Sequence, residues 1–197
     1  MNIPQLQTKL AALPNKLVDE IVLLRLANGA LAIIRKRVLD GQYLEGSSPN
    51  AGEYSTTPMP LPFGKLQATV RKKLSKEELE NKDKYVIFTA KSGNVWISVQ
   101  GGYKAYRQMA GKFNDHVILS WSGRLMRNMG IVQKEKDSYS VGFSDPDVER
   151  IARYHTLEGA GKSHRKHVFF DLSEEERARL TKYAGEELTK EFIKAFK

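Results

Sequence analysis

Cysteine is absent from this sequence of 197 residues. Its absence excludes a disulfide framework, a thiolate nucleophile and a cysteine-based zinc site, and it suits a protein made in a reducing cytoplasm. Long apolar runs are also missing. The most apolar stretch, Ile21 to Ile34, contains Arg25, Asn28 and Gly29. Because it is shorter than the roughly 20 residues that a membrane helix needs, we expect a buried core helix and no membrane contact.

Signals for secretion and for nucleotide binding are absent as well. The N-terminus has no basic segment followed by an apolar run, so we expect no secretory signal. Neither GxxxxGK[ST] nor a GxGxxG after a strand occurs. The run from Gly159 to Ser163 looks like the end of a phosphate loop, but Thr156 stands where the first glycine of that motif belongs.

No catalytic constellation is visible either. No Ser-His-Asp arrangement can be proposed from spacing, and Ser122-Gly123 lacks the flanks of a nucleophile elbow. His155, His164 and His167 lie close together, but no HExxH pattern surrounds them, and the cations of the 162–167 segment repel a metal ion. We therefore expect no enzyme, metal or cofactor, a half-buried and hydrogen-bonded His155, and a basic surface segment over 162–167.

The formal net charge is +9. Such a charge suits three kinds of partner: a nucleic acid, an acidic protein surface or an anionic membrane. Acidic residues are scattered among the basic ones, which argues against a face dedicated to nucleic acid.

Apolar residues recur at helical spacing through the first 40 positions, namely Leu6, Leu10, Leu13, Leu17, Ile21, Leu24, Leu31 and Val38. We expect an arm over residues 1–13 and then a long helix from about Pro14, in its first turn, to Leu39, with Gly41 as its C-terminal stop. The helix is either a simple core helix or one that also packs against a neighbouring subunit.

Residues 46–64 form a Pro/Gly-rich stretch, which predicts a long loop. After it, residues 65–84 have apolar side chains at helical spacing. The runs 85–90 and 95–99 predict one hairpin, and 131–134 and 139–143 predict another, with a short helix from Tyr103 to about Ala110 between them.

The C-terminal third predicts two helices. Asp145 and Pro146 suit the N-cap and first residue of one, and Ser173 with Glu176 forms a capping box for the other. Val168 to Phe170 reads as an edge strand. The apolar stripe of the last helix covers either its own core or another subunit, and consists of Leu180, Ala184, Leu188, Phe192 and Phe196. Residues 1–197 are thus expected to form a single α+β domain with an antiparallel sheet.

Basic and aromatic residues gather between positions 103 and 127, with Asp115 the only acid among them. They are either surface charge with core tyrosines or a contact for DNA or an acidic partner. The residues that we single out for such contact are Lys104, Arg124, Arg127, Lys162, Arg165 and Lys166.

Four segments resemble the virion morphogenesis, or tail-completion and neck, proteins of tailed phages. The first is Arg35 to Gly41 with the loop from Glu53 to Pro58, similar to a "G…YS…P" segment; the second is Gly101 to Arg107, similar to "GGYxxYR". The third is Leu119 to Leu125, similar to "L…(S/T)G.L". The fourth joins Ile151–His155, a Gly-rich break and His167–Glu176.

The four segments span most of the chain from Arg35 onward, and their order makes the match more specific than any one of them. One departure is that the family often has Pro-x-Arg before the aromatic residue, whereas residues 165–170 here read Arg-Lys-His-Val-Phe-Phe. The docking loop that contains residues 165–170 is therefore expected to differ in shape from that of the family.

The resemblance implies a non-catalytic structural role in the virion neck, where such proteins join the head connector to the tail. It implies a homo-oligomeric ring whose neighbours are connector or adaptor, tail terminator and tail tube proteins, with genomic DNA in the channel, and host cytoplasm as the place of assembly. The expected residues of subunit or partner contact are Tyr54, Pro58, Pro60, Phe63, Tyr103, Tyr106, Arg107, Phe192 and Phe196.

Two other functions compete with this one. A free basic nucleic-acid-binding protein is the main alternative, motivated by the net charge of +9, and it predicts steeply salt-dependent DNA binding. A small hydrolase or nuclease rests on the histidine cluster alone.

Overall fold

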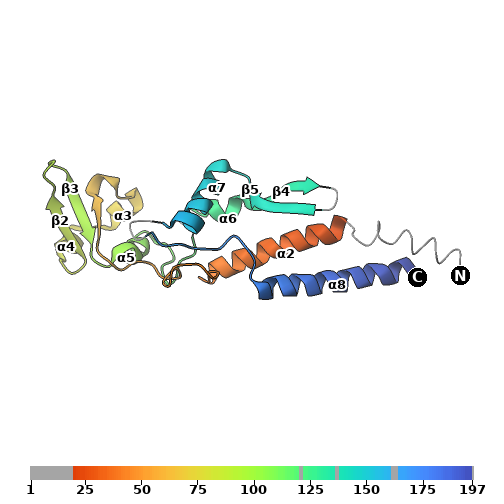
Figure 1. Ribbon diagram of the computed structural model, residues 1–197. Coiled ribbons are helices and arrows are strands. Elements are labelled where there is room, and N and C mark those ends of the chain that lie inside the picture. The colour runs from red at the N-terminus through yellow and green to blue at the C-terminus, as the bar shows by residue number, and fades with distance from the viewer. Residues whose placement is uncertain (1–19, 120–121, 136–137, 161–163, 197) are drawn as a thin grey trace, which may run out of the picture. The chain divides into compact units, whose positions relative to one another are not determined.

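The computed structural model describes residues 20–119, 122–135, 138–160 and 164–196, apart from the side chains of 191, 192, 195 and 196 (Figure 1). The chain divides into two compact units. Unit 1 comprises Met1–Pro49 and Ser122–Lys197, and unit 2 comprises Asn50–Trp121. The expectation of one domain did not anticipate this division, because the Pro/Gly-rich stretch 46–64, in which the first boundary falls, was interpreted as a loop within one domain. The mixture of helices and antiparallel strands confirms the α+β class.

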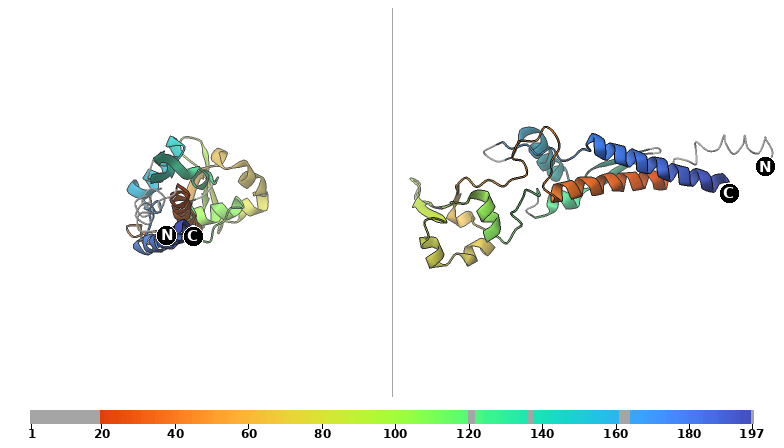
Figure 2. Two further views of the ribbon diagram at one scale, coloured as in Figure 1. Left: turned by 90° about the vertical axis from the view of Figure 1, so that its right-hand side faces the viewer. Right: turned by 90° about the horizontal axis from the view of Figure 1, so that it is seen from below.

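Unit 1 is built on two long antiparallel helices, α2 (Glu20–Leu39) and α8 (Glu174–Phe196), which lie side by side in Figures 1 and 2. Gly29 lies at their crossing, and a Cβ there would meet Leu180 Cδ2 at 3.1 Å. A glycine in the middle of a helix costs about 0.5–1 kcal/mol relative to alanine. At this position it lets the two helices approach closely.

The C-terminal end of α2 and the N-terminal end of α8 agree with the sequence, whereas the expected arm over residues 1–13 and the expected helix start at Pro14 lie outside the described residues. Past Leu39 the amide of Gly41 donates to Val38 at 3.1 Å, and that of Gln42 donates to Arg37 at 2.9 Å, with Gly41 at φ 70°. This is the Schellman C-cap. At the start of α8, the Ser173 amide donates to the Glu176 carboxylate at 2.8 Å, and the Glu176 amide donates to Ser173 Oγ at 3.2 Å. The predicted capping box is confirmed.

The other elements of unit 1 are a hairpin and short helices. Strands β4 (Met129–Glu135) and β5 (Ser138–Phe143) pair antiparallel and contact α2. Around them lie α6 (Arg124–Asn128), α7 (Pro146–Arg153) and a π-helical turn, η2 (Tyr154–Glu158). The core between these elements contains Ile34, Val38, Met129, Val148 and Phe169. The second predicted hairpin is confirmed, as is Asp145 as the N-cap, whose carboxylate accepts from the Asp147 amide at 2.9 Å.

Residues 168–170 are not an edge strand, which corrects the expectation. The Val168 carbonyl accepts from the Leu44 amide at 2.8 Å, and the Val168 amide donates to Ser47 Oγ at 2.8 Å. The short apolar run is therefore held by a turn instead of a sheet. Its burial explains the apolar composition, because Phe169 is fully enclosed.

Unit 2 contains a three-stranded antiparallel sheet in the order β1-β3-β2, with β1 (Met59–Pro62), β2 (Tyr85–Thr89) and β3 (Val95–Val99). Strands β2 and β3 are the first predicted hairpin. Strand β1 lies inside the stretch 46–64 that was expected to be loop throughout, and it pairs Met59 with Val99 and Pro62 with Trp96. That expectation was wrong because an edge strand tolerates proline where the missing amide would face outward.

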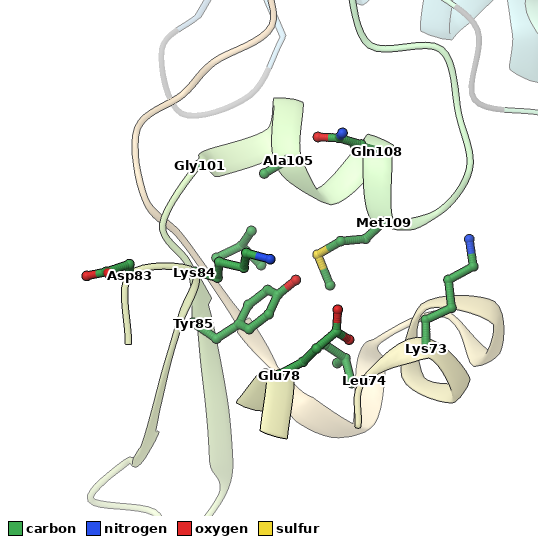
Figure 3. Close-up of a pocket in the computed structure, with 11 residues that line it drawn as sticks. Lys73, Leu74, Glu78, Asp83, Lys84, Tyr85, Gly101, Ala105, Gln108 and Met109 are labelled. Carbon is green, nitrogen blue, oxygen red and sulfur yellow. The ribbon is translucent and has the colours of Figure 1, made fainter. Parts of the chain in front are cut away.

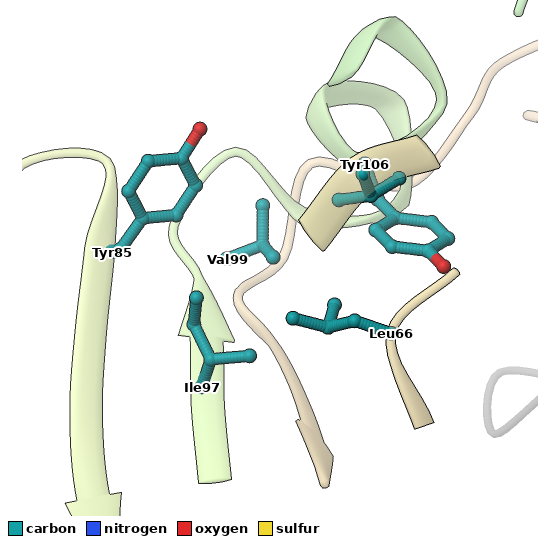
Figure 4. Packing of buried hydrophobic residues seen from close by; sticks show 6 residues of the cluster. Leu66, Tyr85, Ile97, Val99 and Tyr106 are labelled. Atoms are coloured by element: carbon teal, nitrogen blue, oxygen red, sulfur yellow. The ribbon is translucent and has the colours of Figure 1, made fainter. Parts of the chain in front are cut away.

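Helices cover one face of this sheet: η1 (Phe63–Lys65), α3 (Ala68–Lys73), α4 (Lys76–Glu80) and α5 (Gly102–Met109). The core of the unit lies beneath them and consists of Leu66, Val70, Tyr85, Ile97, Val99 and Tyr106 (Figure 4). The two ends of unit 2 meet, since the Val117 amide donates to the Gly52 carbonyl at 2.8 Å. The unit thus closes on itself.

Candidate interaction surfaces

An arginine–tyrosine cluster in unit 2 unites four of the expected contact residues. The Arg107 guanidinium lies 4.5 Å from the centre of the Tyr54 ring and 5.9 Å from that of Tyr103. Tyr103 in turn contacts Tyr54 edge-on at 5.7 Å and stacks on Tyr106 at 6.4 Å. Arg107 Nε donates to the Phe113 carbonyl at 2.7 Å. Stacking of arginine on tyrosine is favourable by about 0.5–2 kcal/mol.

This cluster belongs to the interior of unit 2. Arg107 is only 2% exposed, and Tyr54 and Tyr106 are also buried. Burial raises the pKa of the Tyr54 hydroxyl, which accepts from the Ile118 amide at 3.3 Å. Tyr54, Tyr106 and Arg107 therefore have little surface left for a partner, whereas Tyr103 is half-buried.

Two of the four segments behind the resemblance pack directly on each other here. The Lys104 amide of the Gly101–Arg107 segment donates to the Ser55 carbonyl at 3.0 Å. Gly102 has φ 63°, and a Cβ there would lie 2.4 Å from the Thr57 carbonyl oxygen. Only glycine fits such a position. The second glycine of "GGY" is thus required because the backbone of the "YS" segment packs directly against it.

The first and last of the four segments meet in unit 1 through Arg37. Its guanidinium pairs with the Glu176 carboxylate and donates to the carbonyls of Phe169 at 2.6 Å and Asp171 at 2.7 Å. Arg37 is 7% exposed. The end of α2 is therefore bound to the capping box that begins α8, by charge-assisted hydrogen bonds in a buried setting.

The remaining expected contact residues are placed as follows. Pro58 and Pro60 are exposed and Phe63 is half-buried, all in unit 2. Phe192 and Phe196 belong to α8, and their side chains lie outside the described part of the structure.

The expected basic contacts do not form one described cluster. Lys104 is exposed on α5 of unit 2, whereas Arg124, Arg127, Arg165 and Lys166 belong to unit 1, and Lys162 lies outside the described residues. Arg124 pairs with Asp145 at 2.5 Å. That hydrogen bond raises the pKa of Arg124 and lowers the pKa of Asp145. Arg124 therefore binds the N-cap residue of α7 within unit 1, whereas Lys104, Arg127 and Lys166 are exposed to solvent.

Two of the histidines contact each other in unit 1, where His167 is buried and His155 is half-buried as expected. The rings of His155 and His167 meet edge-on at 5.5 Å, and Tyr43 contacts His167 at 5.1 Å. His167 is 5% exposed, which corrects its assignment to a basic surface segment. Burial lowers the pKa of His155. Its Nδ1 has no hydrogen-bond partner among the described residues, which corrects the expectation of a hydrogen-bonded side chain at that atom. Within those residues, no three His, Asp or Glu side chains converge as a metal site would require.

A hollow of about 530 Å³ opens in unit 2 between α4, α5 and the ends of β2 and β3 (Figure 3). Its lining mixes charges of both signs, Lys73, Lys84, Glu78 and Asp83, with the apolar side chain of Met109. Burial raises the pKa of the Tyr85 hydroxyl, and nearby Glu78 raises it further. None of the expected contact residues lines this hollow.

Exposed apolar side chains also occur at positions outside the expected contact residues. In unit 1, Ile151, Tyr154 and Leu157 are 42%, 42% and 57% exposed and follow one another at every third residue along α7 and η2. In unit 2, Val86, Ile87 and Phe88 are 41–44% exposed along β2. The run of four apolar or β-branched residues in β2 was a signal for a buried strand, and it did not show that β2 would be an edge.

Every helix in the described ranges is too short or too polar to cross a lipid bilayer. Comparisons with protein-family models, with curated proteins and with solved structures find no match to this chain.

Proposed function

We propose that this chain is a non-enzymatic structural protein of a tailed-phage virion, placed in the neck where the head connector meets the tail. The observation that carries the proposal is the ordered set of four segments that resemble tail-completion and neck proteins. The physical roles of these segments support it. Ser55 of the first segment and Gly102 of the second pack together, and Arg37 links the first segment to the fourth.

Exposed apolar side chains support the same proposal, because monomeric proteins rarely leave large apolar patches in water. Ile151, Tyr154 and Leu157 are exposed apolar side chains that follow one another on α7 and η2. Ile21 and Leu24 at the start of α2 are exposed as well. In a homo-oligomeric ring, neighbouring subunits and the connector and tail proteins would cover these side chains.

The test is genetic and structural. A phage carrying an amber mutation in this gene is expected to produce filled heads and complete tails that do not join, as seen by electron microscopy. Complementation with the intact chain restores joined particles, and mass spectrometry then detects the chain in purified virions. Infectious, joined particles that lack the chain would refute the proposal.

The competing function is binding of nucleic acid, which the exposed Lys104, Arg127 and Lys166 favour. The purified chain would then bind duplex DNA with an affinity that falls steeply with salt, and a triple Lys104→Ala, Arg127→Ala, Lys166→Ala variant would reduce the salt slope. In the neck, by contrast, the same triple variant is expected to leave joining of heads and tails intact unless these residues face DNA in the channel.

A further inference from the structure

The β2–β3 hairpin determines which backbone groups of β2 face the outer edge of the sheet in unit 2. The Gln100 amide donates to the Lys84 carbonyl at 2.9 Å, and the Ala90 amide donates to the Asn94 carbonyl at 2.9 Å. Hydrogen-bonded positions recur at every second residue of an antiparallel pair. The even-numbered residues of β2 therefore bond to β3, and its odd-numbered residues direct their amides and carbonyls outward.

Two amides on this outer edge are open. Tyr85 directs its amide to the Asn81 carbonyl at 2.9 Å, so that position is satisfied within unit 2. The amides of Ile87 and Thr89 have no acceptor among the described residues, and both residues are exposed. An edge with unpaired amides and carbonyls is a template for another strand.

The opposite edge of the sheet is closed by proline. Met59 and Leu61 of β1 pair with Val99 and Ile97, the odd-numbered residues that face away from β2. Pro60 and Pro62 then face outward, where neither has an amide to donate. The sheet can therefore be extended by regular pairing along β2 and not along β1 (Figure 4, with β2 and β1 on the two sides of β3).

The side chains beside the open edge are apolar on the face that the helices leave uncovered. Tyr85 is buried and belongs to the core, so Val86 and Phe88 point to the other face. Phe88 stacks on Trp96 of β3 at 6.4 Å, yet it is 42% exposed. A partner strand beside β2 would bury more of this aromatic pair.

We propose that β2 pairs antiparallel with β2 of a second copy about a two-fold axis at Phe88, so that the two sheets become one sheet of six strands. In this register, Ile87 lies opposite Thr89 of the second copy. Their open amides and carbonyls form four hydrogen bonds across the axis, and the amide of Tyr85 keeps its bond to Asn81. The two Phe88 side chains face each other in a non-hydrogen-bonded pair.

The second copy is the occupant because the open amides of Ile87 and Thr89 lie symmetrically on either side of Phe88, so that a two-fold pairing of the strand with itself satisfies all of them at once. Residues 85–89 carry no charged side chain, so no like charges lie opposite each other within the paired strands.

This inference goes beyond the proposed function, since it concerns the free protein before it joins any particle. A two-fold pair uses both open edges and cannot grow further. It would therefore protect an aggregation-prone strand until assembly.

Single-cysteine variants test the register directly, because the chain has no other thiol. In the proposed pair, the two Phe88 Cα atoms lie about 4.5 Å apart, which suits a disulfide. Phe88→Cys in the full chain is expected to form a disulfide-linked dimer under mild oxidation. Val86→Cys is the control on the same face; its two copies lie about 14 Å apart, four residues out of register, and it is expected to stay unlinked. Equal cross-linking of the two variants, or none in either, would overturn the register.

The backbone bonds are tested without relying on cysteine. Light scattering and sedimentation of the unaltered full chain are expected to show a dimer. Thr89→Pro removes two of the four bonds and should raise the dimer dissociation constant about tenfold or more, whereas Thr89→Ala keeps the amide and should change it little. In hydrogen exchange, Ile87 and Thr89 should lose protection on dilution while Val86 and Phe88 keep it. A monomer at all concentrations, or equal effects of the two Thr89 variants, contradicts the pairing whether or not the chain joins heads to tails.

Discussion

At the scale of single residues, Arg37 joins the end of α2 to the segment 169–176 in unit 1. Its buried guanidinium bonds Glu176 and two backbone carbonyls. Arg37→Ala would remove the positive partner of the Glu176 carboxylate and the donors to both carbonyls, so we expect a loss of about 3–5 kcal/mol in the free energy of unfolding. Urea denaturation of the variant measures this loss.

The neighbouring Lys36 provides a matched control. Its ion pair with Asp40, at 2.5 Å, is exposed and spans one helical turn. Lys36→Ala should therefore cost no more than about 0.5 kcal/mol. If Arg37→Ala were as mild as Lys36→Ala, the buried network would not be what holds α2 to the start of α8.

The free energy of unfolding should depend on pH through the protonation of His155. Because burial lowers the pKa of His155 in the folded state, the unfolded chain, with an ordinary pKa of about 6.5, takes up the proton first as the pH falls. The free energy of unfolding is therefore expected to decrease as the pH falls below about 6.5 and to level off below the folded pKa. Denaturant titrations between pH 7.5 and 5.5 measure the slope.

Replacing the imidazole identifies the group. His155→Leu should flatten the slope in this window. The carboxylates with lowered pKa values, Glu187 and Asp145, titrate at lower pH and do not interfere. An unchanged slope in the His155 variant would assign the effect to another residue.

The candidate site shows what residue types alone can reveal. Tyr54, Tyr103, Tyr106 and Arg107 were all expected contact residues, and the structure brings them together. Core tyrosines were one of the two alternatives for this stretch, but the burial of Arg107 was not predicted, because an arginine beside tyrosines has the same composition on a surface as in an interior cluster. That distinction depends on the segment carrying Tyr54, which is remote in sequence and contacts α5 only in the fold.

At the scale of elements, the two prolines of β1 should control how the sheet of unit 2 associates. A double Pro60→Thr, Pro62→Thr variant would restore two outward amides without removing any bond to β3. We expect unit 2 to keep its fold and the chain to associate beyond a dimer or to aggregate. Light scattering at increasing concentration checks this.

A double substitution of two even-numbered residues of β2 serves as the contrast. Val86→Thr and Phe88→Thr leave the amides of the strand unchanged and reduce only its apolar surface, so they should lower association. Equal behaviour of the two double variants would mean that edge hydrogen bonds do not govern association.

Elements with local signals were predicted well, and elements that depend on distant partners were not. The capping box at Ser173 and the Schellman end at Gly41 each reside in a few consecutive residues. Strand β1 was missed because its prolines are acceptable only once β3 lies on its inner side. The run 168–170 was taken for a strand because its apolar residues signal burial, and burial here comes from the turn at 44–48 and α2.

At the scale of the whole molecule, the division into two units predicts that unit 2 folds by itself. Its own core surrounds Ile97 and Val99, and the Gly52–Val117 bond closes its ends. A fragment of residues 50–121 is expected to give a dispersed NMR spectrum and a cooperative unfolding transition. A fragment of residues 50–112, which lacks the closing bond and Ile118, should be less stable. Random-coil shifts in the longer fragment would show that unit 2 depends on the remainder of the chain.

The bond between Gly52 and Val117 has a consequence for the history of such a gene. A segment whose first and last residues lie side by side can be inserted into a gene, deleted from it or exchanged. The remaining chain then has to span only a short distance between the two insertion points. Related proteins that keep α2, the β4–β5 hairpin and α8 but carry a different insert at this point would be the trace of that exchange.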